Sequence, residues 1–134
     1  MPTATILVVE DEETVRSVIA RTLEEAGFAV LQAEHGEAAL GVVRGFLGVL
    51  ALAVVDMNMP VMTGSEFARE FRPMRPSVPV LFITGREPIV RGARVLLKPF
   101  GPDILLQTVA EVLGEAARGG QRRTRERPSR TSAG

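Results

Sequence analysis

The apolar residues of the chain fall into short runs that predict five β-strands. The first run, TILVVE at residues 5–10, is rich in β-branched side chains and does not alternate with polar residues. Such runs are typical of strands that are buried on both faces, as in a parallel sheet. Four further strands are predicted at residues 28–33, 49–56, 78–84 and 93–98.

Between these runs, apolar residues recur three and four positions apart, which predicts amphipathic helices. Gly27 ends the first helix, the second runs from about Gly36 to Phe46, the third follows the segment MPVMTG, and the last begins at Pro102. The positions expected to face the core are Val15, Val18, Ile19, Leu23 and Ala26, then Ala39, Leu40, Val43 and Phe46, then Phe67 and Phe71, and finally Leu105, Leu106, Val109, Val112 and Leu113.

Strands that alternate with helices predict an α/β fold with a parallel sheet and helices on both faces. Ligands of such folds bind beyond the carboxyl ends of the strands, close to the switch in strand order. The polar residues predicted at those ends are Glu10, Asp11 and Glu12 after the first strand, Asp56 after the third, Thr84 after the fourth and Lys98 after the fifth.

This set of residues predicts a site for a metal ion and a phosphate. Carboxylates that are packed together repel one another unless a cation joins them, and oxygen ligands suit Mg²⁺. The metal in turn attracts phosphate. Lys98 is the only lysine among sixteen basic residues, and its compact ammonium group differs from the broad planar guanidinium of arginine.

Composition restricts the remaining possibilities. A length of 134 residues suits one domain, the absence of cysteine excludes disulfides, and a single histidine makes a zinc site unexpected. No signal peptide or membrane span fits the sequence, so a cytoplasmic protein is expected. Residues 1–117 carry ten basic and fifteen acidic side chains, whereas residues 118–134 carry six arginines and one glutamate. The first segment is predicted to be the folded domain, and the second a disordered basic tail.

Four motifs in order, LVVEDE, VVDMNMPVMTG, VLFITG and LLKPF, resemble those of the receiver domains of bacterial two-component response regulators. The resemblance covers roughly residues 4–117. It implies the CheY-like, flavodoxin-like fold, with strand order 2-1-3-4-5.

The resemblance also implies a role for each residue of the metal site. Asp56 matches the residue that accepts the phosphoryl group, and Asp11 matches a direct ligand of Mg²⁺. Glu10 matches a neighbouring acid that acts through water, and Asn58 matches the position whose backbone carbonyl completes the metal shell.

On the phosphate side of the site, Thr84 matches the hydroxyl that donates to a phosphoryl oxygen. Lys98 matches the cation that pairs with the phosphate. The peptide bond between Lys98 and Pro99 matches one that is cis in the family.

Three features depart from the family pattern. Glu10 stands where aspartate is more usual, and Val95 replaces a switch aromatic. The segment from Gly85 to Gly92 between the fourth and fifth strands is short and contains Pro88, so the fourth helix of the family is expected to be missing or reduced to a loop.

The favoured interpretation is a stand-alone signalling module that takes a phosphoryl group on Asp56 from a histidine kinase or a histidine phosphotransfer protein and alters the binding of an unknown output protein. It is not expected to be an enzyme with a separate substrate. One alternative is a receiver-like scaffold that works without phosphorylation. Another is an aspartyl phosphotransferase, which Asn58 disfavours because such enzymes usually carry an acid two residues after the nucleophile. Binding to nucleic acid depends on the basic tail alone and is the weakest of these hypotheses.

Overall fold

The computed structural model describes residues 3–86 and 92–133, the last fourteen of these by their backbone only. Within those ranges the elements alternate between strands and helices from β1 to β4, as the apolar pattern predicts. They are β1 (Thr5–Val9), α1 (Glu13–Glu25), β2 (Ala29–Ala33), α2 (Gly36–Gly45), β3 (Leu50–Asp56), α3 (Gly64–Met74), β4 (Val80–Thr84), β5 (Arg94–Leu97) and α4 (Pro102–Ala133). Each strand is shorter than its apolar run by one or two residues.

The five strands form one parallel sheet in the order β2-β1-β3-β4-β5. The predicted flavodoxin-like fold and its strand order are therefore confirmed. The strand β1 is completely buried, as expected of a run without alternation, whereas the edge strands β2 and β5 are partly exposed. The strand β2 lies on one side of β1, and β3, β4 and β5 follow on the other, so the strand order switches between β1 and β3, where such folds bind ligands.

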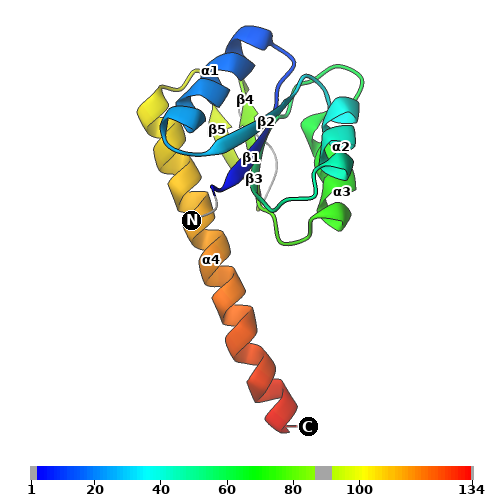
Figure 1. Cartoon of the computed structure of the whole chain (residues 1–134), viewed down its shortest axis with the longest axis vertical. Helices are drawn as coiled ribbons and strands as arrows, with labels where there is room; N and C mark the ends of the chain where they lie inside the picture. Colours follow the sequence, from blue (N-terminus) through cyan, green and yellow to red (C-terminus); the bar gives the residue numbers. More distant parts are fainter. Residues whose placement is uncertain (1–2, 87–91, 134) are drawn as a thin grey trace.

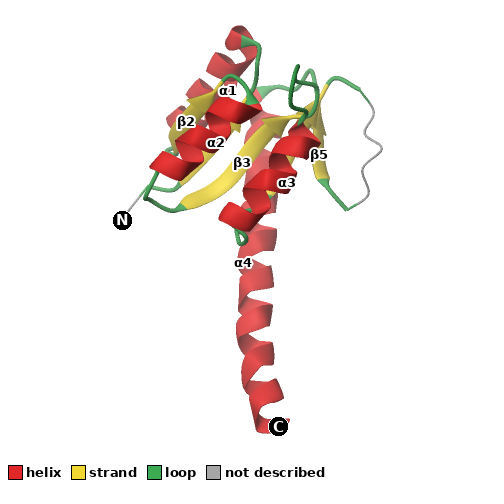
Figure 2. Ribbon diagram, turned by 90° about the vertical axis from the view of Figure 1, so that its right-hand side faces the viewer, coloured by secondary structure: helices red, strands yellow, loops and turns green. Residues whose placement is uncertain are grey.

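Two apolar layers hold the helices to the sheet (Figures 1 and 2). Helices α2 and α3 cover one face, where Phe67 and Phe71 stack with ring centroids 5.4 Å apart. Helices α1 and α4 cover the other face, through residues such as Leu23 and Val109.

Most of the positions predicted to face the core are buried or half-buried, but the predictions for Val18 and Ala26 are wrong. Ala26 is exposed because it caps the C-terminus of α1, which ends at Glu25. Val18 is 57% exposed, because it lies at the border of the stripe that α1 turns toward the sheet.

The register of the sheet aligns the carboxyl ends of its strands. Val9 pairs with Val55, so that Glu10 follows β1 beside the last residue of β3. Asp56 pairs with Ile83 and Thr84 pairs with Leu97. The polar residues that follow or end β1, β3, β4 and β5 are consequently neighbours in space.

The connection between β4 and β5 contains nine residues, 85–93, and residues 87–91 lie outside the described part of the chain. The described residues of this connection, Gly85, Arg86, Gly92 and Ala93, are not helical. The described ranges hold four helices, so the family's fourth helix is absent from them. The prediction of a loop from Gly85 to Gly92 falls mainly on the undescribed residues.

The last helix, α4, is longer than its packed apolar face. The guanidinium group of Arg94 in β5 lies 3.6 Å from the carboxylate of Glu111 and 3.7 Å from that of Glu115, which ties α4 to the sheet. Beyond this contact the backbone stays helical to Ala133, and the helix projects from the domain (Figure 1). The disordered basic tail expected at residues 118–134 stays a prediction. A helical backbone there needs no packing against the domain, because extending an existing helix through arginine, glutamine and glutamate needs no new nucleus.

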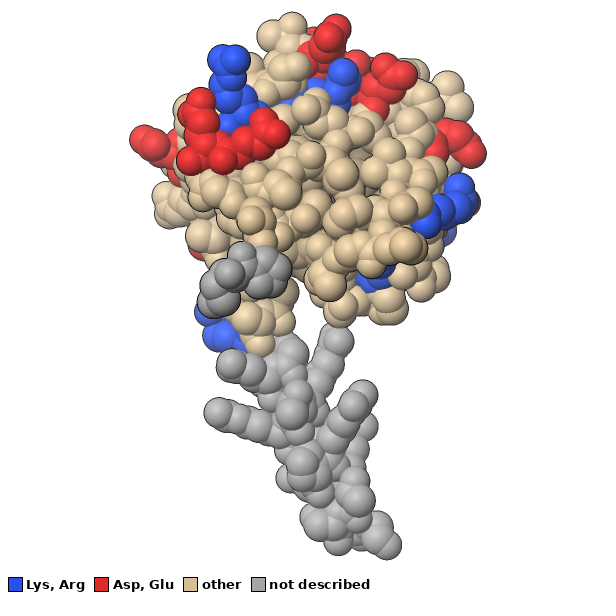
Figure 3. All heavy atoms as spheres, in the orientation of Figure 1, with Lys and Arg blue, Asp and Glu red and all other residues tan. Residues whose placement is uncertain are grey.

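The charged side chains are unevenly distributed over the surface. Charged side chains gather toward the top of the domain in the view of Figure 3, and a broad central area of that face is uncharged. None of the helices in the described ranges combines the length and the apolar character needed to cross a membrane.

Candidate functional site

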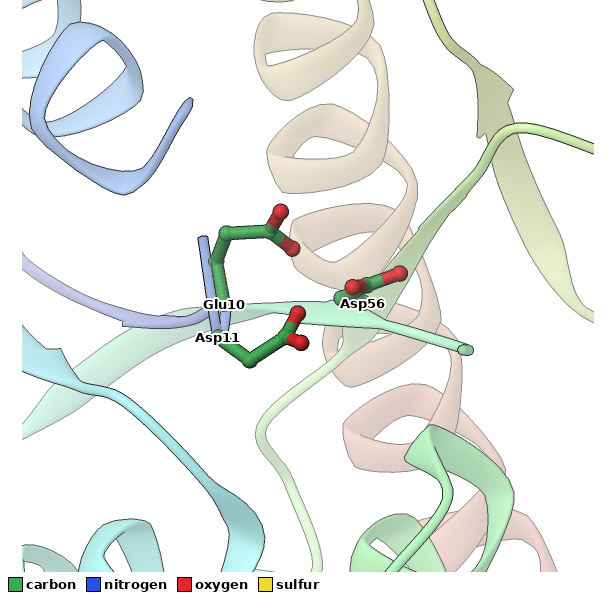
Figure 4. A group of neighbouring side chains, drawn as sticks. All are labelled: Glu10, Asp11 and Asp56. Atoms are coloured by element: carbon green, nitrogen blue, oxygen red, sulfur yellow. The ribbon is translucent and has the colours of Figure 1, made fainter. Parts of the chain in front are cut away.

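Three carboxylates meet at the carboxyl edge of the sheet. Glu10 and Asp11 follow β1 and Asp56 ends β3, and each offers an oxygen within 4.8 Å of the others. Figure 4 shows the side chains of Glu10 and Asp11 directed toward Asp56. Glu10 is completely buried and Asp56 is 3% exposed, whereas Asp11 lies at the surface. The predicted acidic cluster is thus assembled by the fold.

Hydrogen bonds to the backbone hold the residues that carry these carboxylates in place. The N–H of Glu10 donates to the carbonyl of Ala33 at 3.1 Å, and the guanidinium of Arg16 donates to the carbonyl of Glu10 at 2.8 Å. After Asp56, the N–H of Met57 donates to Ile83 at 2.9 Å. Both peptide groups of Glu10 are therefore held by neighbouring elements, which limits the freedom of its side chain.

Lys98 reaches the cluster from the carboxyl end of the edge strand β5. Its ammonium nitrogen lies 2.9 Å from a carboxylate oxygen of Glu10 and 3.7 Å from one of Asp56. Its backbone N–H donates to the carbonyl of Thr84 at 2.7 Å, and the following peptide bond to Pro99 is cis, as the resemblance implies. Burial acts to lower the pKa of Lys98, but its hydrogen bond to Glu10 and the nearby carboxylates outweigh burial and raise the pKa.

The single ammonium group of Lys98 does not neutralise the charge of the three carboxylates. Burial raises the pKa of Glu10 to about 7, and hydrogen bonding and repulsion with Asp56 add to this effect. The ion pair with Lys98 acts in the opposite direction, but burial outweighs it, since the second oxygen of Glu10 is buried without a hydrogen-bond partner in the described part of the chain. The pKa of Asp11 is raised as well, first by burial and then by Asp56. A cluster with surplus negative charge and a free carboxylate oxygen is suited to a divalent cation that takes oxygen ligands.

Thr84 and Asn58 form a second part of the site. The backbone N–H of Asn58 donates to Asp56 at 3.1 Å, and its side-chain amide donates to the hydroxyl oxygen of Thr84 at 2.7 Å. The N–H of Arg86 donates to the same hydroxyl oxygen at 3.2 Å. The sequence interpretation gave Asn58 only a backbone role, so it missed the contact that the side chain makes with Thr84.

These residues surround a cavity of about 370 Å³. Its lining comprises Glu10, Asp11, Glu12, Asp56, Asn58, Gly85, Arg86 and Lys98. Of the predicted site residues only Thr84 is absent from the lining, but its hydroxyl is hydrogen-bonded to Asn58 and Arg86, which both line the cavity. Arg86 was not predicted to belong to the site. The only feature of the sequence that could have indicated it is its position two residues after Thr84.

The segment after Asp56 is shaped by the start of α3. Thr63 and Glu66 form a capping box, in which the hydroxyl of Thr63 accepts from the N–H of Glu66 and the carboxylate of Glu66 accepts from the N–H of Thr63. Gly64 then packs directly on the backbone of Asp56, with no room for a side chain. This contact sets the end of β3, and with it the position of the Asp56 carboxylate.

Comparison with known proteins agrees with this geometry. The family model for the response regulator receiver domain matches residues 6–110. The chain belongs to this family. The receiver is 32% identical over 120 residues to a chemotaxis protein CheY homologue of Campylobacter jejuni, with 81% of this chain and 92% of that protein aligned. It is also 34% identical over 118 residues to the sensor kinase CckA of Brucella abortus, where 82% of this chain covers only 12% of that protein.

Solved structures give the same result. The receiver superposes on Vibrio cholerae chemotaxis protein CheY4 with a TM-score of 0.76 and 32% identity, covering 83% of this chain and 99% of that one. For the receiver domain of the hybrid histidine kinase CckA the TM-score is 0.75 and the identity 37%, over 82% and 99% of the two chains. Response regulator TrrA of Thermotoga maritima, solved in complex with Mg²⁺-BeF, gives 0.72 and 29% over the same shares.

Membership of the family defines the general role of the receiver. Receiver domains are signalling modules of two-component systems that interact with histidine kinases and output proteins. The acidic pocket formed by Glu10, Asp11 and Asp56 is typical of the Mg²⁺ sites of such domains.

Proposed function

We propose that the receiver accepts a phosphoryl group on Asp56 from a phosphohistidine of a histidine kinase or a histidine phosphotransfer protein, and that phosphorylation alters its binding to an output protein. The observation that supports this most directly is the position of the Asp56 carboxylate. It lies between two further acids and the ammonium group of Lys98, at the wall of an open cavity.

The transfer is a substitution at phosphorus. A carboxylate oxygen of Asp56 forms the new P–O bond while the P–N bond to the donor histidine breaks. The electron pair of that bond leaves with the imidazole, which then takes a proton from solvent. The product is an aspartyl phosphate on a chain that acts on no separate substrate, and hydrolysis of its acyl phosphate would return Asp56 to the free carboxylate.

Each neighbouring residue has a place in this reaction. Asp11, Asp56 and the carbonyl of Asn58 would hold Mg²⁺, with Glu10 acting on its water shell, and the ion would supply positive charge to the phosphoryl oxygens. Lys98 pairs with the phosphoryl group, to which it brings a compact charge. Thr84 donates its hydroxyl proton to a phosphoryl oxygen.

The glutamate at position 10 is compatible with this arrangement. It retains the charge of the aspartate that is more usual in the family, and its free, buried oxygen is available to a hydrated cation. The TrrA structure with Mg²⁺-BeF supports a magnesium-dependent site in a relative of this chain.

Incubation with Mg²⁺ and acetyl phosphate, followed by intact mass measurement, tests the proposal. Wild type is expected to gain the mass of one phosphoryl group, and Asp56→Asn is expected to gain none, because the amide is not a nucleophile of this kind. Addition of EDTA should abolish the gain in wild type. If wild type stays unmodified while it still binds a partner kinase, the receiver works as a scaffold without phosphorylation.

A further inference from the structure

The hydroxyl oxygen of Thr84 is held by two N–H donors. The side-chain amide of Asn58 lies 2.7 Å from it and the backbone N–H of Arg86 lies 3.2 Å from it. Thr84 itself is 2% exposed, and its own carbonyl accepts from the N–H of Lys98 at 2.7 Å. The threonine is therefore fixed on its backbone side and on its side-chain oxygen.

This arrangement determines what the hydroxyl can still do. A threonine hydroxyl has two acceptor lone pairs and one proton to donate. Asn58 and Arg86 occupy the two lone pairs, so the proton is the only hydrogen-bonding capacity that remains. The oxygens of a phosphoryl group accept hydrogen bonds and donate none in their ionised form, so they need a partner in this state.

We propose that the side chain of Asn58 is a positioning residue for phosphoryl transfer, and that it acts through Thr84. The inference rests on the proposed phosphorylation of Asp56. By occupying a lone pair of the Thr84 hydroxyl, the carboxamide directs the O–H proton away from itself and toward the phosphoryl group as the P–O bond to Asp56 forms. A donor that is oriented before the reaction stabilises developing negative charge without having to reorganise.

The place of Asn58 in the fold supports this role. Its backbone N–H donates to the Asp56 carboxylate at 3.1 Å, while its side chain crosses to the end of β4. One residue therefore contacts both the nucleophile and the hydroxyl that would stabilise the transferred group. Asn58 also lines the cavity, so the contact lies where a phosphoryl donor would enter.

A double-mutant cycle tests the inference. The rate of phosphorylation by acetyl phosphate at saturating Mg²⁺ is measured for wild type, Asn58→Ala, Thr84→Val and the double variant. In the wild-type background, Asn58→Ala is expected to slow phosphorylation by about fivefold to tenfold, which is the range for loss of one hydrogen bond. In the Thr84→Val background the same change is expected to have no effect, because the hydroxyl through which Asn58 acts is gone.

Two controls separate this role from a structural one. Asn58→Ala keeps its backbone carbonyl, so the stabilisation by Mg²⁺ in thermal unfolding should match that of wild type. Thr84→Ser keeps a hydroxyl, so the effect of Asn58→Ala should return in that background. Equal slowing by Asn58→Ala in the Ser and Val backgrounds would overturn the inference, as would faster phosphorylation of Asn58→Ala.

The outcomes also distinguish this inference from the proposed function. If wild type is phosphorylated, Asp56→Asn is not, and Asn58→Ala reacts at the wild-type rate, then only the proposed role of Asn58 is refuted. Failure of wild type to be phosphorylated at all removes both proposals.

Discussion

The carboxylate of Glu10 combines full burial, an ion pair with Lys98 and an oxygen that has no hydrogen-bond partner in the described part of the chain. Its pKa of about 7 means that the folded protein holds a proton there which the unfolded chain releases near the ordinary value of 4.5. Between these values the folded state binds more protons than the unfolded state. The free energy of unfolding should therefore fall as the pH rises through this window.

In EDTA, the stability of wild type is expected to decrease from about pH 4.5 to about pH 7, and the raised pKa of Asp11 adds to the decrease. Chemical denaturation at a series of pH values measures this. Glu10→Gln removes the titrating group and should flatten the profile. The stabilisation by Mg²⁺ should in turn grow across the same range, because the ion binds the deprotonated cluster. A metal-free profile that is level or that rises toward pH 7 would show that burial does not control Glu10.

Most residues of the candidate site could be predicted from the sequence because of where they lie in the fold. Glu10, Asp11, Asp56 and Lys98 end or follow strands of a parallel sheet, so the fold class alone brings them together. The side-chain contact of Asn58 with Thr84 could not be predicted in this way. It depends on the path of the loop after β3, which no periodicity encodes.

At the level of elements, the packing of α3 against the end of β3 leaves no space at Gly64. A β-carbon there would lie 2.5 Å from the carbonyl oxygen of Asp56 and 2.8 Å from the Cα of Met57. These are backbone atoms, which cannot rotate away as a flexible side chain can. The glycine thus sets the distance between the helix and the nucleophile.

Gly64→Ala is expected to destabilise the protein by at least about 1–3 kcal/mol and to slow phosphorylation, because the backbone of Asp56 must move. The matched control is Gly41→Ala in α2, where the added β-carbon meets nothing within 4 Å. This change should stabilise the protein by about 0.5–1 kcal/mol and leave phosphorylation unaltered. Urea denaturation and the acetyl phosphate assay report both effects. Equal stability of Gly64→Ala and wild type would refute the proposed constraint.

The elements themselves were predictable because burial and periodicity act over several residues at once. The five strands and the packed part of all four described helices follow from the apolar pattern. The predictions for Val18 and Ala26 are wrong because apolar character alone does not define the edge or the end of a helical stripe. The strands are one or two residues shorter than predicted, because apolar residues such as Val49 and Val78 precede them and the charged Glu10 and Lys98 follow β1 and β5 outside the ladder.

For the whole molecule, we propose that residues 1–117 form the functional unit. The contacts that tie α4 to the sheet involve Glu111, Glu115 and the buried Val112, all before this boundary. The chain after the boundary carries six arginines and one glutamate, and its sequence has no apolar face.

Removal of residues 118–134 is therefore expected to change the free energy of unfolding by no more than about 0.5 kcal/mol, as for other changes outside the core. The rate of phosphorylation by acetyl phosphate should also be unchanged. Thermal unfolding and intact mass measurement provide the two readouts. A large loss of stability in the shortened protein would place the terminal part of α4 within the folded unit.

The pairing of Glu10 with Lys98 joins residues that are 88 positions apart in the chain. Contacts of such long range carry the entropy cost of closing the intervening chain, and proteins rich in them fold more slowly. A chain shortened before β5 would therefore keep the three acids of the site but lack the lysine that pairs with Glu10 and Asp56.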